Sequence, residues 1–200
     1  MRREHLHERQ RLKLALVLTG TYSLVELAGG WLVNSLALMS DAGHMLADVG
    51  ALGVSLFAAY VATLPATSQK TFGYYRAEIL AALMNGLALW LVAGVIFGEA
   101  YQRFFNPPEV GGRGLVLVAS FGLAVNLLTA WILRPARGRS LNLRGAFLHV
   151  LSDAVGSVGA ITAGAVILLT GWHRTDPLVS GAIAVLILSS SFVCLATFLS

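Results

Sequence analysis

Six long apolar segments, separated by short polar or proline-containing breaks, make up almost all of this 200-residue chain. They cover approximately residues 12–33, 36–63, 74–104, 114–134, 143–170 and 177–199. A helix needs roughly 20 mostly apolar residues to cross the hydrocarbon core of a bilayer. The pattern therefore predicts an all-α membrane protein with six transmembrane helices, preceded by a polar cytoplasmic tail at residues 1–11.

Turn and helix-ending residues mark the breaks between these segments. Asn34-Ser35 predicts a tight turn, and prolines end the second and fourth segments at Pro65 and Pro135, because the residue before proline resists helix. Polar loops are expected at 64–73, around Asn106-Pro107-Pro108 and at 136–142. Asp176-Pro177 predicts the start of the last helix, with Asp176 as its N-cap and proline in its first turn.

Composition supports the membrane interpretation. The chain is 56% hydrophobic and 12% charged, whereas soluble domains carry about 25% charged residues. No segment is left for a sizeable soluble domain, and the single cysteine, Cys194, lies in an apolar run and forms no disulfide framework. We expect a multi-pass protein of the cell, or inner, membrane, with lipid around it and no nucleic-acid partner.

The positive charges lie mainly on one side of such a bundle. With six spans both termini share a side, which receives eleven basic residues: Arg2, Arg3, Arg9, Arg11, Lys13, Lys70, Arg76, Arg134, Arg137, Arg139 and Arg144. The other side receives three, Arg103, Arg113 and Arg174. Because cytoplasmic loops carry the excess of Lys and Arg, both termini are predicted to be cytoplasmic.

The motif H-x-L-[AS]-D occurs twice, about one hundred residues apart, each time inside an apolar segment. It is His44–Asp48 in the second segment and His149–Asp153 in the fifth. Ionisable side chains within a bilayer are costly and are functional candidates by default. Residues four apart share a helix face, and the two helices run antiparallel. Each histidine can therefore lie level with the aspartate of the other helix, which predicts one four-ligand cluster.

This ligand set suits Zn²⁺, which binds imidazole nitrogen and carboxylate oxygen at about 2 Å in tetrahedral geometry. Cd²⁺, Co²⁺, Ni²⁺ and Fe²⁺ also remain compatible, because affinity order alone does not exclude them. Two aspartates offset a divalent ion, whereas the empty site brings two anions together and takes up protons instead. Metal and protons then compete for the same groups, so we expect proton antiport.

Four further residues are candidates for supporting the ligands or lining the ion pathway. Asp41 shares the face of His44 and Asp48, and Glu26, Asn85 and Asn126 lie in the first, third and fourth segments. Such residues can orient a metal-binding imidazole through a hydrogen bond. In the third segment Gly94 and Gly98 form a GxxxG pattern, for which we expect packing within the chain, with a dimer contact as the alternative.

Three stretches carry a resemblance to a known family. Asn34–Asp48 is similar to the second-helix motif of the cation diffusion facilitator family, Phe72–Glu78 resembles the start of its third helix, and Asn142–Ser157 resembles its fifth. The resemblance implies a six-helix transmembrane domain, usually a homodimer, that exports Zn²⁺ in exchange for H⁺. It also implies an intramembrane site at His44, Asp48, His149 and Asp153, in the two-histidine form of the zinc-transporting branch.

The chain departs from that family in two places. Many relatives have a histidine-rich loop between helices 4 and 5, whereas 135–142 is short and contains no histidine. Relatives usually continue after helix 6 into a cytoplasmic, metal-binding, dimerising domain, which the 200 residues do not include. We therefore leave homodimerisation and metal-sensing regulation open.

Two other functions were weighed against metal export. In a membrane haem protein, His44 and His149 would be axial ligands, but the aspartates at i+4 would then have no role. An intramembrane metalloenzyme needs an open water position and a general base; the chain has no H-E-x-x-H motif, and four protein ligands would close the site. We therefore expect a transporter without enzymatic activity or cofactor, with Zn²⁺ as its substrate.

Overall fold

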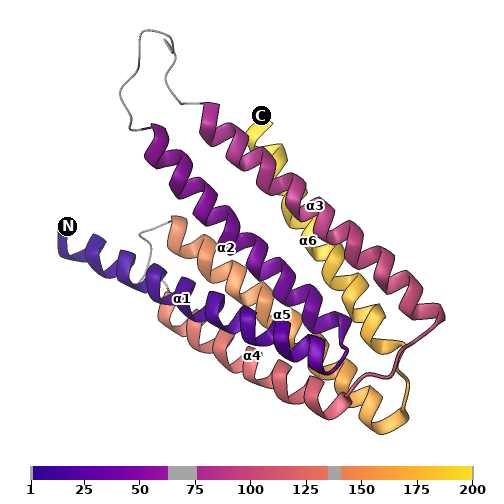
Figure 1. Cartoon of the computed structure of the whole chain (residues 1–200). Coiled ribbons are helices and arrows are strands. Elements are labelled where there is room, and N and C mark those ends of the chain that lie inside the picture. Colours follow the sequence, from indigo (N-terminus) through magenta and orange to yellow (C-terminus); the bar gives the residue numbers. More distant parts are fainter. Residues whose placement is uncertain (1, 63–75, 135–140, 200) are drawn as a thin grey trace.

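The computed structural model describes the backbone of residues 2–62, 76–134 and 141–199, and in this part of the chain it contains six α-helices and no strand (Figure 1). The helices are α1 (Arg2–Leu32), α2 (Leu36–Ala62), α3 (Arg76–Phe105), α4 (Gly112–Leu133), α5 (Leu141–Thr170) and α6 (Thr175–Leu199). The six helices predicted from the apolar segments are confirmed. The expected loop at 64–73 and most of that at 136–142 lie outside the described residues.

Helix α1 begins at Arg2 and so includes nearly all of the polar tail predicted at residues 1–11. The polar residues there continue the helix beyond its apolar part. Within the described residues, three helical stretches are long and apolar enough to cross a membrane by length and composition: Gln10–Leu32, Gly112–Leu133 and Arg144–Thr170. Large apolar side chains cover the outside of the bundle; Trp31 is 73% exposed and Leu169 86%. Such a surface suits lipid.

The helices form two groups joined by α2. In Figure 1, α1, α4 and α5 lie together on one side of α2, and α3 and α6 lie together on the other. The start of α1 and the end of α6 are at the same end of the bundle. Helix α2 packs against α1, α3, α5 and α6. Residues on α2 are therefore placed where the two groups meet.

Two apolar clusters flank the duplicated motif. One cluster joins α2, α4 and α5 near the α1–α2 turn and contains Ala37, Leu38, Leu115, Ala119, Ala160, Ala163 and Ile167. The other lies toward the N-terminal end of α1 and contains Ala15, Ala130, Leu133 and Val150. A third cluster joins α3 to α6. The motif residues thus lie between a packed apolar layer near the α1–α2 turn and a second apolar cluster, part of which lines a cavity.

Glycines allow close contact between helices at some positions. The two glycines predicted to do so in the third segment make no such contact with the described residues. A Cβ at Gly164 would lie 2.7 Å from Val116, so α5 and α4 need glycine there. Nothing lies within 4 Å of a Cβ at Gly94 or Gly98. The expectation that this GxxxG packs within the chain is therefore wrong, because that face of α3 points away from the rest of the described structure.

The start of α2 is held by a residue from another helix. Asn34 has φ 57°, a left-handed conformation that asparagine tolerates, and makes the predicted tight turn before α2. Asp176 does not cap its own helix as predicted, because α6 already begins at Thr175. Its buried carboxylate instead accepts hydrogen bonds from Ser35 Oγ (2.6 Å), Leu36 N (2.7 Å) and Ala37 N (3.3 Å). It thereby satisfies free N–H groups in the first turn of α2.

Candidate metal centre

The duplicated motif brings its side chains together between α2 and α5. His44 and Asp48 lie one turn apart on α2, and His149 and Asp153 one turn apart on α5. Helical spacing alone directs each pair to one face. The packing of α2 on α5 then brings the two faces toward each other.

Three of the four predicted ligands form a compact group. One ligand atom from each of His44, Asp48 and His149 lies within 4.8 Å of the other two. Asp48 Oδ2 is the centre of the group, 3.1 Å from His149 Nε2 and 3.5 Å from His44 Nε2. The two imidazole rings meet edge to face, with centroids 5.6 Å apart. The aspartate of α2 therefore lies level with the histidine of α5, as the antiparallel arrangement predicts.

The fourth predicted ligand lies at the edge of this group. Asp153 Oδ2 is 3.8 Å from His149 Nε2, and its side chain is 3% exposed. Asp153 is outside the three-residue group itself. Asp153 therefore joins the site through its contact with His149, one turn earlier on the same helix.

The spacing between these atoms fits a small divalent ion. Four ligands at about 2.0–2.1 Å from a tetrahedral ion lie roughly 3.3 Å from one another. The separations of 3.1, 3.5 and 3.8 Å found here bracket that value. The ligand atoms of His44, Asp48 and His149 therefore have a spacing compatible with one ion, whereas Asp153 contacts the group through His149.

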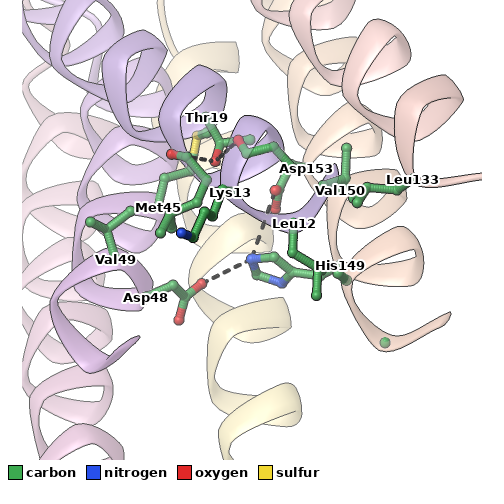
Figure 2. A pocket seen from close by; sticks show the side chains of 14 residues that line it. Leu12, Lys13, Thr19, Met45, Asp48, Val49, Leu133, His149, Val150 and Asp153 are labelled. Carbon is green, nitrogen blue, oxygen red and sulfur yellow. Dashed lines mark hydrogen bonds and ion pairs between the residues drawn. The ribbon is translucent and has the colours of Figure 1, made fainter. Parts of the chain in front are cut away.

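A cavity of about 630 Å³ leads to the site from the end of the bundle where α1 begins. Asp48, His149 and Asp153 line it, and Figure 2 shows His149 between the two aspartates. His149 is 45% exposed, whereas His44 is 15% exposed and is not among the lining residues. An ion in the cavity would therefore meet His149 and Asp48 first.

Lys13 also lines this cavity, and the sequence reasoning did not identify it as part of the site. In Figure 2 its side chain extends among the lining residues near Met45 and Asp48. In the charge distribution along the sequence, Lys13 is only one of the basic residues of the N-terminal region. The sequence pattern that could have identified Lys13 is its spacing from Leu12, Leu16 and Thr19. These residues share its helix face and also line the cavity.

Three of the four supporting candidates are buried close to the ligands, and the fourth lies outside the described side chains. Glu26, Asp41 and Asn126 are 0%, 4% and 0% exposed. Asn126 Nδ2 donates a hydrogen bond to Ser157 Oγ (3.3 Å), one turn from Asp153 on α5. The prediction for Asn85 concerns a side chain that the structure does not describe.

The geometry does not suit a haem between the two histidines. A bis-histidine haem needs its porphyrin plane between the two coordinating nitrogens. Asp48 Oδ2 lies within 3.5 Å of both Nε2 atoms and occupies that space. Asp48, which has no role in a haem site, therefore occupies the space that the porphyrin would need.

Comparison with known proteins agrees with this geometry. Residues 12–197 match the cation efflux transmembrane domain. The chain belongs to the cation efflux, or cation diffusion facilitator, family. It is a multi-pass membrane protein, as the apolar segments predicted.

Several bacterial members of this family are similar over most of the chain. The cadmium, cobalt and zinc/H(+)-K(+) antiporter of Bacillus subtilis (strain 168) is 48% identical over 183 residues, which cover 90% of this chain and 59% of that protein. Metal cation efflux system protein CzcD of Cupriavidus metallidurans is 44% identical, with 94% and 60% covered. Zinc transporter ZitB of Yersinia pestis is 45% identical, with 92% and 59% covered. The chain thus spans about 59% of the length of the first of these relatives.

Proposed function

We propose that this chain is the transport domain of a divalent metal exporter, which moves Zn²⁺ out of the cytoplasm in exchange for protons. The observation that carries the proposal is the group formed by His44, Asp48 and His149, with Asp153 beside it, at the end of a cavity within a membrane domain. Two imidazoles and two carboxylates form a ligand set suited to Zn²⁺. The names of relatives, which include zinc, cadmium and cobalt, support the same class of ion.

Proton coupling follows from the chemistry of the ligands. Metal binds the deprotonated carboxylates and neutral imidazoles, so metal binding releases protons and protons displace metal. The two aspartates neutralise a divalent ion, which lowers the cost of holding it in a low-dielectric site. The name of the Bacillus subtilis relative, which pairs metal with H⁺ and K⁺, supports an exchange mechanism.

The position of the cavity supports an alternating-access cycle. The cavity opens near Leu12 and Lys13, at the end of the bundle that the charge distribution assigns to the cytoplasm. Beyond the ligands, the apolar cluster of α2, α4 and α5 lies near the α1–α2 turn and closes the opposite side. We assign this arrangement to the inward-facing state, from which a change in packing between helices exposes the site to the outside.

The exposed face of α3 suits contact with a second copy of the chain. Gly94 and Gly98 have no neighbour within 4 Å of a built Cβ, and Leu91 and Val95 beside them are 69% and 66% exposed. Small residues in a membrane helix allow another helix to approach closely. We propose that the transporter is a homodimer with α3 at its interface. Cysteine cross-linking at position 94 in membranes would detect this contact, and its absence would contradict it.

Reconstitution tests the transport function directly. The chain is incorporated into vesicles that contain a zinc-sensitive dye and, in parallel samples, a pH-sensitive dye. We expect an imposed zinc gradient to drive zinc in one direction and protons in the other. Empty vesicles and vesicles with the Asp48→Ala variant serve as controls. Zinc movement without proton movement would contradict antiport, and no metal movement above the controls would contradict transport.

A further inference from the structure

A second polar layer lies inside the bundle, between the metal ligands and the α1–α2 turn. Its members are Glu26 on α1, Asp41 on α2, Asn126 on α4 and Ser157 on α5. Their exposed fractions are 0%, 4%, 0% and 0%. Four helices thus contribute a polar side chain to one interior region, none of which lines the cavity that leads to the metal site.

Helix contacts place these residues at one level. A Cβ at Gly20 would contact Val49 and one at Gly30 would contact Leu38, which sets α1 antiparallel to α2 with Glu26 near Asp41. Asp41 Oδ1 lies 3.2 Å from the Cβ position of Gly156 on α5, so glycine makes room for this carboxylate. Ser157, the next residue, accepts the hydrogen bond from Asn126.

The hydroxyl of Tyr22 interacts with the carboxyl group of Glu26, but neither oxygen of that group accepts a hydrogen bond of good geometry from the described residues. Both oxygens are buried without such a partner, as are Asp41 Oδ2 and Asn126 Oδ1. Tyr22, one turn before Glu26, donates its hydroxyl proton to the Val118 carbonyl 2.9 Å away. The layer therefore contains several hydrogen-bond acceptors, and the Tyr22 hydroxyl beside Glu26 donates to a backbone carbonyl.

Such an environment favours the neutral acid over the carboxylate. An ionised carboxylate buried without hydrogen bonds or a counter-ion is strongly disfavoured, and a bound proton removes the charge and supplies a donor. The charged groups that face Glu26 do not offset this: Asp41 from α2 and Asp153 from α5 are also acidic. Helix α4 contributes the neutral Asn126, since its only charged residue, Arg113, is exposed in its first turn. The basic side chain of His149 on α5 interacts electrostatically with Asp41.

We propose that Glu26 is a proton-binding site, distinct from the four residues proposed to bind the metal, that gives up its proton when a divalent ion occupies the site between α2 and α5. The positive charge of the ion offsets the acidic groups around Glu26 and makes its carboxylate form less costly. Return of the proton after the ion leaves restores the neutral layer. This inference rests on the proposed function, because it assigns one of the exchanged protons to a named group.

The test compares the number of protons moved for each zinc ion in vesicles that contain the wild type, Glu26→Gln or Glu109→Gln. Glutamine keeps the shape of the protonated acid but cannot release a proton, and Glu109 is an exposed carboxyl outside the layer. We expect Glu26→Gln to transport zinc with a proton-to-zinc ratio lower by about one. Glu109→Gln should keep the wild-type ratio. An unchanged ratio in Glu26→Gln overturns the proposal.

A spectroscopic measurement covers the case in which Glu26→Gln does not fold. Infrared difference spectra with and without zinc detect the carbonyl band of a protonated carboxyl that loses its proton. In Glu26→Asp, which keeps a carboxyl in the layer, we expect this band to move in frequency. A band at the wild-type frequency overturns the proposal. Failure of the proposed function is distinguished separately, because wild-type vesicles would then move no more zinc than empty vesicles.

Discussion

His149 Nε2 lies 3.1 Å from Asp48 Oδ2, and this contact joins α5 to α2 in the interior of the bundle. It pairs the histidine of one motif copy with the aspartate of the other. The contact is shorter than either contact within a motif, which are 3.5 Å for His44–Asp48 and 3.8 Å for His149–Asp153. The site is therefore formed between the helices, and a change in their packing would alter its geometry.

Substitution of any one ligand should abolish metal transport. We expect His44→Ala, Asp48→Ala, His149→Ala and Asp153→Ala each to reduce zinc flux to the level of empty vesicles, because a site with three ligands holds the ion weakly. Ser152→Ala is the matched control, since Ser152 is exposed beside Asp153 and donates a hydrogen bond to the Leu148 carbonyl on its own helix. Wild-type flux in two of the four variants would rule out this ligand set.

The histidine of α2 should influence which ion is carried. His44→Asp replaces a nitrogen ligand with oxygen and adds negative charge, which favours harder and larger ions. We expect weaker discrimination between Zn²⁺ and both Cd²⁺ and Mn²⁺, measured as competition of each ion with zinc uptake. An ion preference identical to that of the wild type would show that selectivity is determined elsewhere.

The ammonium group of Lys13 should slow the arrival of metal. Lys13 lines the cavity that contains Asp48 and Asp153, so its charge repels a divalent cation in the same space. We expect Lys13→Gln to lower the KM for zinc a few-fold, with a smaller difference at high ionic strength. Arg11→Gln removes the same charge from an exposed position that does not line the cavity. An equal effect in both variants would indicate a general surface potential instead.

The carboxylate of Asp176 should stabilise the fold without taking part in transport chemistry. Asp176→Ala leaves the Ser35 hydroxyl and the Leu36 and Ala37 N–H groups without their buried acceptor. Loss of a capping group costs about 0.5–2 kcal/mol, and more when the acceptor is charged. We expect a clear fall in the thermal unfolding temperature of the purified protein.

Ser35→Ala provides the comparison for Asp176, since it removes only one of the three hydrogen bonds and should lower the unfolding temperature less. Zinc flux per folded molecule should stay near that of the wild type in both variants. An Asp176→Ala protein as stable as the wild type would contradict the role of Asp176 in holding the start of α2.

Local features of the sequence were sufficient to predict the number and approximate bounds of the helices. Apolar length determines a membrane helix because every backbone polar group in lipid must be satisfied within the segment. The same local logic identified His44, Asp48, His149 and Asp153, since ionisable residues are rare in such segments and these recur with i,i+4 spacing. Apolar length does not predict that α1 begins as early as Arg2, because the residues there are polar and carry no membrane signal.

Relationships between helices required the tertiary structure. The sequence indicated Asp176 as the cap of its own helix, but its carboxylate bonds to α2, about 140 residues earlier. It indicated Gly94 and Gly98 as internal packing positions, but they lie on an open face. No pattern in the sequence indicated the cavity that Lys13 lines. Each of these depends on which helix faces are turned toward one another, and hydropathy along one helix does not contain that information.

The sequence by itself determined a six-helix membrane domain and two pairs of candidate metal ligands, because both follow from spacing within single helices. The tertiary structure decided that Asp48 lies against His149, that Asp153 stays at the edge of the group, and that Glu26 is fully buried near Asp41. The physical reason is that side-chain packing between helices sets their depth and rotation. An apolar sequence allows many such packings, and only the folded chain selects one of them.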